Sequence, residues 1–244
     1  MPRWIHHHGG GTQKIVNYQR AAERLPEPVR RYILHFEACI EDAVTRFAAA
    51  LPDSARILDA GAGEGAYAAH FGGRRYVGVD LGIGDAGWDY SKLDAIADLA
   101  ALPFPAACFD AALNIVTLEH VREPACVLRE LARALKPGGQ LLLIVPHEWE
   151  EHQTPHDYFR YTRYGMRYLL EKAGFTVVEI QPAGGFFRLL ARRLLNALQF
   201  FPGLWFFPAA VFFGPPALLL PLLDPIDKRR NFTLGFICIA RKSF

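Results

Sequence analysis

One ten-residue stretch limits the fold of this chain more than any other: Arg56-Ile57-Leu58-Asp59-Ala60-Gly61-Ala62-Gly63-Glu64-Gly65. Its first five residues are mainly apolar and predict a short buried strand. The glycines that follow allow a tight turn and let a ligand approach the main chain closely. Residues 66–70 then predict the start of a helix, whose free N–H groups and dipole favour anionic ligands. A strand, a glycine loop and a helix in this order predict a nucleotide-type binding site.

The glycine spacing distinguishes two classes of nucleotide. Dinucleotide-binding proteins carry G-x-G-x-x-G after the first strand. Here the third glycine comes one residue early, in the order Gly61-x-Gly63-x-Gly65, and Asp59 precedes the first. An NAD-type dehydrogenase is therefore the less favoured alternative. The D-x-G-x-G-x-G form resembles the first motif of the class I S-adenosylmethionine (SAM)-dependent methyltransferases.

Further segments extend this resemblance along the chain. Asp80 ends the next predicted strand about twenty residues after Asp59, where an acid accepts hydrogen bonds from ribose hydroxyls. The pair Asp98-Leu99 and the stretches 118–121 and 135–139 follow in the family's order. Together these segments are similar to the small-molecule, methyltransferase type 11-like branch. The resemblance covers roughly 55–240, with one large insertion.

The resemblance implies a cofactor and the residues that hold it. The cofactor is SAM, and the product is S-adenosylhomocysteine. Asp80 would hold the ribose, Asp98 would accept from the adenine amine, and Leu99 would pack on the adenine ring. The implied cofactor-binding residues are Asp59, Ala60, Gly61, Gly63, Gly65, Asp80, Leu81, Asp98, Leu99 and Asn114.

The expected fold is Rossmann-like: one doubly wound α/β domain with a seven-stranded sheet, mostly parallel with an antiparallel last strand. N-terminal helices and an apolar helical insertion before the last strand complete it. We expect a flexible tail over 1–14, a helical cap over 15–52 and the SAM-binding domain over 53–244, with the insertion at 184–230. The cap helices, predicted at 15–25 and 28–51, either shape the substrate entrance or pack on the sheet. The loop 81–92 carries Trp88, which either packs internally or stacks on a ligand.

Composition excludes several other functions. The formal net charge is only +2, and no basic stripe with interleaved aromatic residues occurs, so we expect no nucleic-acid partner. The four cysteines lie far apart without a C-x-x-C pair, which predicts reduced core residues of a cytoplasmic protein. The His6-His7-His8 run is assigned to the tail. No metal site is expected.

A polar and aromatic segment, 146–162, follows the fifth predicted strand and is the expected acceptor side of the site. It resembles a methyltransferase subgroup associated with glycan or lipid-linked glycan modification. His152 is the candidate general base, because imidazole titrates near neutral pH. His120 and His147 are the rival candidates for this role. The expected substrate-binding residues are His120, His147, His156, Asp157, Tyr158, Arg160 and Tyr161.

Structural alternatives remain open for several of these side chains. Asp157 and Arg160 form either a substrate site or an ion pair that holds the loop. Thr162 is also a suitable N-cap. A metal site built from His147, His152 and His156 is disfavoured, because Pro155 breaks the helix that would align the last two.

The insertion is the most apolar part of the chain. A helix is predicted over 186–201, residues 200–223 carry no charge, and Lys228-Arg229-Arg230 follow. The run is long enough to span a bilayer, but its prolines argue against one continuous spanning helix. We favour attachment at a membrane interface, or docking of a lipid substrate, through 186–223, over self-association as a homo-oligomer, internal packing or true insertion. The expected location is cytoplasmic, peripheral at the inner face of the membrane.

These observations predict a SAM-dependent methyltransferase that acts on an oxygen of a small-molecule, glycan or lipid-linked acceptor. The alternative from another class is a non-catalytic SAM-binding module at a membrane.

Overall fold

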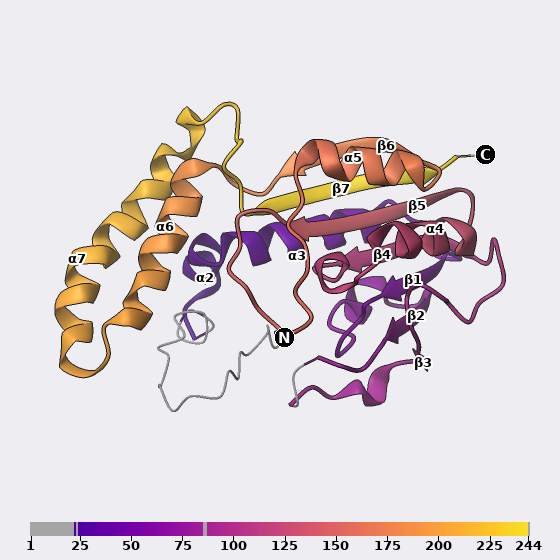
Figure 1. The fold of residues 1–244 in the computed structure, drawn as a ribbon, viewed down its shortest axis with the longest axis horizontal. Helices are drawn as coiled ribbons and strands as arrows, with labels where there is room; N and C mark the ends of the chain where they lie inside the picture. The colour runs from indigo at the N-terminus through magenta and orange to yellow at the C-terminus, as the bar shows by residue number, and fades with distance from the viewer. Residues whose placement is uncertain (1–21, 23, 85–86, 244) are drawn as a thin grey trace. The chain divides into compact units, whose positions relative to one another are not determined.

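The computed structural model describes residues 22, 24–84 and 87–243, and these divide into two compact units (Figure 1). The first unit contains the described residues between 42 and 181 and between 236 and 243. The second contains those between 22 and 41 and between 182 and 235. The predicted helix over 15–25 lies almost entirely outside the described residues.

The first unit is built on a seven-stranded sheet with the order β3-β2-β1-β4-β5-β7-β6. Strands β1 to β5 pair in parallel, and β7 runs antiparallel to them, which confirms the expected Rossmann-like fold (Figure 1). The strands are β1 Arg56–Ala60, β2 Arg75–Asp80, β3 Ala95–Ile96, β4 Phe109–Ile115, β5 Leu135–Pro146, β6 Phe175–Pro182 and β7 Gly235–Lys242.

The strand order reverses between β1 and β4. From β1 the chain builds outward to β3, then returns to place β4 on the other side of β1, where Leu58 is in register with Ala112. At such a reversal the connecting segments diverge and leave a crevice at the carboxyl ends of the strands. The glycine loop follows β1 directly, so the fold places it in this crevice.

The core of the first unit lies between the central strands and the helices α4 Pro124–Ala134 and α5 Arg163–Lys172. Helix α4 buries Val127, Leu128 and Leu131 on one face, at spacings that put them side by side. Each such side chain contributes about 1.5–3 kcal/mol by leaving water. Thr162 caps α5, because its Oγ1 accepts a hydrogen bond of 3.1 Å from the Gly165 N–H.

The segment after the glycine loop differs from the prediction. Residues 66–70 do not begin an α-helix; they form turns and a short 3₁₀ helix, η1 Ala68–Phe71. Gly72 and Gly73 follow at once and lead into β2, so the connection is too short for several helical turns. No α-helix follows the glycine loop, so no helix dipole can act on a ligand at this point. The main chain of the loop must itself provide the contacts that were expected from a helix N-terminus.

The second unit is helical. It contains α2 Glu27–Ile33, the first part of α3 His35–Ala49, α6 Phe186–Ala197 and α7 Phe206–Leu219. Helices α6 and α7 pack side by side as a hairpin (Figure 1). The turns η4 Leu198–Phe200 and η5 Gly203–Trp205 join them, and η6 Leu220–Ile226 follows α7.

This division differs from the predicted domains, because the N-terminal helices do not form a unit of their own. The Tyr32 hydroxyl donates a 2.6 Å hydrogen bond to the Leu218 carbonyl, and Glu37 pairs with buried Arg192 at 3.8 Å. These contacts tie residues before 42 to the insertion, whereas the rest of α3 belongs with the sheet. The predicted long helix over 28–51 is interrupted at Leu34, where ψ is 59°.

The insertion is helical as expected, but its prolines do not interrupt the helical structure, contrary to the argument against one continuous helix. Helical structure continues from Gly203 to Ile226 through η5, α7 and η6. Pro208 lies in the first turn of α7, where its missing N–H has no intrahelical partner. Pro215 and Pro216 remove two donors but keep their carbonyls, and Pro216 accepts from the Leu220 N–H.

The glycine loop generates a test of the fold. Gly61 has φ +92°, and a Cβ there would lie 2.3 Å from the Thr117 side chain. Gly73 has a similar φ of +81°, but nothing lies within 4 Å of the added Cβ. Both alanine substitutions strain the backbone, and only Gly61→Ala adds a clash, so we expect it to lower the unfolding free energy by about 2 kcal/mol more than Gly73→Ala. Urea denaturation of the two variants measures this difference, and equal losses would contradict the observed packing.

Candidate functional site

A cavity of about 550 Å³ lies in the first unit at the carboxyl ends of β1, β2 and β4. This volume is typical of small-ligand sites. Both main-chain and side-chain polar groups reach it. Its lining includes Gly61, Gly63, Gly65, Asp80, Leu81, Trp88, Asp98, Leu99, Thr117, His120, Gln153 and His156.

Asp80 organises the cofactor side of this cavity. One carboxylate oxygen accepts a hydrogen bond of 3.0 Å from the Gly63 N–H, and the other accepts one of 2.9 Å from the Gly82 N–H. Each carboxylate oxygen has two lone pairs, so both keep capacity for a ligand hydroxyl. Asp80 therefore fixes the glycine loop and also lies where the ribose is expected.

Asp98 and Leu99 lie in the same cavity, as the family resemblance implied. Asp98 Oδ1 accepts a 2.8 Å hydrogen bond from the Ala100 N–H, which holds its carboxylate in place. Leu99 is almost fully buried and presents an apolar surface beside it. A carboxylate next to an apolar surface suits the amine edge and the face of an adenine ring.

Trp88 is part of the cavity wall. An added Cβ on Gly63 would lie 3.1 Å from the indole ring, so the indole lies directly against the glycine loop. The nearby Tyr90 hydroxyl accepts a 2.8 Å hydrogen bond from the Gly84 N–H, which fixes the start of this loop. Of the two roles open from the sequence, the geometry places Trp88 where a ligand is expected.

Three of the expected cofactor-binding residues lie behind the cavity instead of lining it. Asp59 is buried and accepts a hydrogen bond from the Tyr76 hydroxyl. The Asn114 amide donates a 2.7 Å hydrogen bond to the Ala60 carbonyl. Asp59, Ala60 and Asn114 therefore support the strand ends from which the loop departs, and the structure shows no surface on them that faces the cavity.

Most of the expected acceptor residues also support the loop after β5. Arg160 and Asp157 form a bidentate ion pair, with Nη1–Oδ1 at 2.6 Å and Nη2–Oδ2 at 2.7 Å. This favours the structural alternative for these two residues. The Tyr161 hydroxyl donates a 2.8 Å hydrogen bond to the Leu118 carbonyl, and His147 Nδ1 lies 2.9 Å from the Tyr161 carbonyl. Tyr158 accepts from Arg122.

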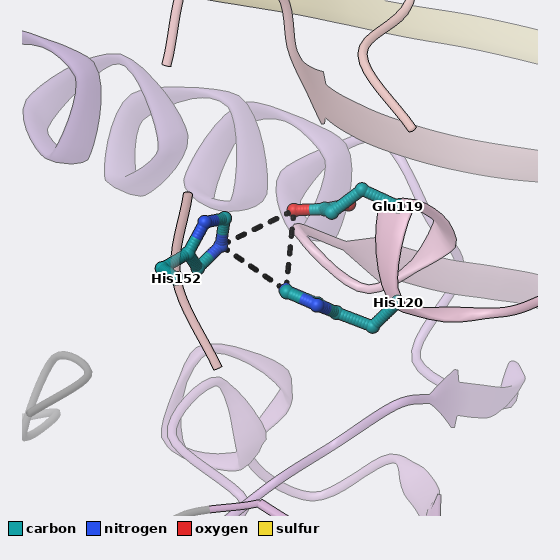
Figure 2. A group of neighbouring side chains, drawn as sticks. All are labelled: Glu119, His120 and His152. Carbon is teal, nitrogen blue, oxygen red and sulfur yellow. Dashed lines mark hydrogen bonds and ion pairs between the residues drawn. The ribbon is translucent and has the colours of Figure 1, made fainter. Parts of the chain in front are cut away.

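His120 and His156 are the two expected acceptor residues that line the cavity. His152, the predicted general base, does not. It is buried, and burial lowers its pKa to about 4. Its Nε2 lies 3.1 Å from His120 Nε2, and Figure 2 shows the two rings meeting close to Glu119. A base must reach its substrate, and His152 lies outside the lining of this cavity, which argues against the predicted role.

Glu119 is the residue that sequence reasoning missed. It lies in the turn η3 Leu118–His120, just after β4, and its side chain is fully buried. Burial raises its pKa to about 8. Its place beside His120 at a strand end was the available signal, because that edge of the sheet carries the ligand site. Glu119, His120 and His152 bring their ligand atoms within 4.8 Å of one another.

Residues 32–180 match a family model described as a methyltransferase domain. A malonyl-[acyl-carrier protein] O-methyltransferase from Erwinia pyrifoliae is 31% identical over 138 residues, which cover 53% of this chain and 52% of that protein. A ubiquinone biosynthesis O-methyltransferase from Xanthomonas oryzae is 44% identical over 55 residues, covering 22% of each. The chain thus spans about half or less of the curated relatives it matches.

A solved structure supports the fold. The Burkholderia thailandensis 1,6-didemethyltoxoflavin-N1-methyltransferase, with 1,6-didemethyltoxoflavin and S-adenosylhomocysteine bound, superposes with a TM-score of 0.51 at 20% identity. The match covers 93% of this chain and 90% of that chain.

Asp59 makes the stability of the fold depend on pH. Burial raises its pKa to about 7, against an opposing effect of the Tyr76 hydrogen bond. The folded chain therefore keeps a proton that the unfolded chain releases near pH 4, so this group lowers the unfolding free energy as the pH rises from about 4 to 7. Asp59→Asn removes this slope, and relative to the wild type it should gain up to about 4 kcal/mol across that window.

Urea denaturation of both proteins at several pH values measures this difference. Tyr76→Phe is the companion variant, because losing the hydrogen bond should extend the slope to higher pH. Parallel stability profiles for Asp59→Asn and the wild type would show that Asp59 is ionised in the folded protein.

Proposed function

The chain belongs to the methyltransferase-domain family of SAM-dependent enzymes, and from this premise we propose that it transfers a methyl group from SAM to an oxygen of a small or lipid-linked acceptor. One observation carries the proposal: the cavity at the strand reversal joins bare glycine main chain, Asp80 and Asp98 to a side lined by histidines.

The residues on the cofactor side fit SAM. Trp88 lies so close to Gly63 that this position has room only for main-chain atoms. A larger residue at position 63 would press against the indole ring. The two acids supply acceptors for hydroxyl and amine groups, and Leu99 supplies an apolar surface. SAM brings a methyl group on a positively charged sulfur.

The acceptor side has two tasks. It must align the acceptor oxygen with the methyl carbon, since proximity and orientation supply much of the rate. It must also accommodate the proton that a hydroxyl loses. His120, Gln153 and His156 line the same cavity and are the polar groups available for both tasks. The names of two relatives, both O-methyltransferases, support oxygen as the atom methylated.

We also propose that the second unit attaches to the cytoplasmic surface of a membrane. Residues Gly203–Ile226 form a helical segment long and apolar enough to cross a bilayer by length and composition alone, and the segment is mostly exposed. Large exposed apolar side chains gather on it: Leu204, Trp205, Phe207, Val211, Phe212, Leu219, Leu222 and Ile226. With Lys228-Arg229-Arg230 close behind, the segment suits the interface of an anionic membrane.

Calorimetry and methyl transfer test the enzymatic part. We expect the wild type to bind SAM and S-adenosylhomocysteine, and not NAD, and to pass a labelled methyl group to hydroxyl or carboxyl acceptors in a panel of small molecules and lipid extracts. Asp80→Asn should weaken SAM binding by about 10-fold or more, because it loses a loop hydrogen bond and a ribose acceptor. Asp94→Asn is the matched control, since Asp94 Oδ2 accepts from the Gly78 N–H at 2.8 Å outside the cavity.

The outcomes separate the alternatives. SAM binding without transfer to any acceptor would favour the non-catalytic module, and transfer to nitrogen alone would contradict an oxygen acceptor. Equal SAM affinity in the two variants would remove Asp80 from the cofactor site.

Vesicle flotation tests the membrane proposal. The wild type should bind phosphatidylglycerol vesicles more strongly than phosphatidylcholine vesicles. Phe212→Glu should reduce binding by about 10-fold or more, because an exposed aromatic ring that enters the membrane interface is replaced by a charge. Tyr164→Glu, at an exposed aromatic residue of α5, should leave binding unchanged. A wild type that ignores both vesicle types, or that buries α7 in a dimer, would contradict interfacial attachment.

A further inference from the structure

Three side chains point at one another, and one of them, His120, lines the acceptor side of the cavity (Figure 2). Glu119 and His120 come from the turn after β4, and His152 comes from the loop after β5. His120 Nε2 and His152 Nε2 are 3.1 Å apart. Glu119 Oε1 lies 3.7 Å from His120 Nε2 and 4.0 Å from His152 Nε2. All three atoms carry electron pairs unless a proton occupies them.

The hydrogen bond of His120 fixes its tautomer. Its Nδ1 lies 2.7 Å from the His156 main-chain carbonyl oxygen. A carbonyl can only accept, so Nδ1 carries the hydrogen. In the neutral ring, Nε2 therefore presents its lone pair toward His152.

His152 has the same tautomer. Its Nδ1 faces the Glu150 carbonyl at 3.2 Å and Asp157 Oδ2 at 3.4 Å, and both oxygens are acceptors. Arg160 Nη2 also lies 3.5 Å away, but its two hydrogens are used in bonds of 2.7 Å to these same two oxygens. Nδ1 must therefore donate, and Nε2 presents its lone pair toward His120.

Two lone pairs and a carboxylate thus converge in a buried place. Neither Glu119 oxygen has a hydrogen-bond partner among the described residues. Such a group is repulsive unless a proton or a metal cation lies between its members. A shared proton would reach only two of the three atoms, whereas a metal ion would reach all of them.

We propose that Glu119, His120 and His152 bind one Zn²⁺ ion. Two imidazole nitrogens, each about 2.0–2.1 Å from a tetrahedral zinc, lie roughly 3.3 Å apart, close to the observed separation. The Nδ1–H groups bound to oxygen acceptors are the outer contacts that orient histidine ligands of metals. Asp157 and Arg160 acquire a role here, because their ion pair holds the acceptor that orients His152.

The zinc ion gives the acceptor side of the cavity a way to activate the acceptor hydroxyl. This role of the ion rests on the proposed methyl transfer. Three protein ligands leave the fourth zinc position for a water or a substrate oxygen, and His120 lines the cavity. A hydroxyl bound to zinc loses its proton to water more readily. The resulting oxygen forms a bond to the methyl carbon while the carbon–sulfur bond breaks, and sulfur keeps the electron pair. This proposal departs from the expectation of no metal site, and it makes His152 a metal ligand instead of a general base.

Zinc titration of the metal-free full-length chain tests the proposal, with Zn²⁺ alone as the probe and a chelator as competitor. The chain also contains His6-His7-His8, so every protein carries alanine at these three positions. We expect one ion per chain in this background. Glu119→Gln, which keeps the side-chain shape, and His152→Ala should each weaken binding by about 100-fold or more. His147→Ala, outside the cluster, should bind as the background protein does.

Thermal unfolding gives a second readout. Zinc should raise the melting temperature of the background protein and of His147→Ala, and leave that of Glu119→Gln unchanged. The metal-free Glu119→Gln variant should melt no lower than its metal-free parent, because it removes a buried acid; this shows that the variant folds. Equal zinc affinity in the background protein and Glu119→Gln would overturn the proposal. Neither readout uses SAM or an acceptor, so failure here leaves the methyl-transfer assay as a separate test.

Discussion

The hydrogen bonds between Asp80 and the main chain of Gly63 and Gly82 hold the site together. They join the end of β2 to the loop after β1, so the loop is fixed although only a 3₁₀ turn follows it. Thr117 closes the loop from the β4 side, where an added Cβ on Gly61 would meet it at 2.3 Å. The cavity depends on these contacts, because its cofactor side is made mostly of this main chain and its close neighbours.

Sequence patterns predicted the parts of the fold that depend on local chemistry. β1 has its predicted bounds and β2 ends at the predicted residue, because buried parallel strands are apolar and end at polar or glycine positions. The helix expected at 66–70 was wrong, since nothing in that stretch shows how soon β2 must begin. The N-terminal helices were predicted, but not their grouping with the insertion, which depends on contacts between residues far apart in the chain.

The residues of the candidate site also fall into a group that the sequence predicted and a group that it did not. Glycines and strand-end acids were predictable, because main-chain access and ribose binding restrict the residue types. The roles within 146–162 were not, since Asp157, Arg160 and Tyr161 are as suitable for holding a loop as for binding a substrate. Glu119 was hidden for a different reason. The role of a buried acid depends on the side chains that surround it. One of these, His152, comes from a loop that is distant in the sequence.

Asp224 gives the apolar segment an unexpected property. It is the sole acidic residue between Gly203 and Ile226, and it is buried. Its carboxylate accepts from the Gly185 and Arg188 N–H groups at the first turn of α6, where the helix dipole favours a negative charge. The acid is thereby turned inward to cap a neighbouring helix. The exposed side chains of α7 and η6 therefore carry no charge, and the proposed contact with an anionic membrane would meet no electrostatic repulsion from them.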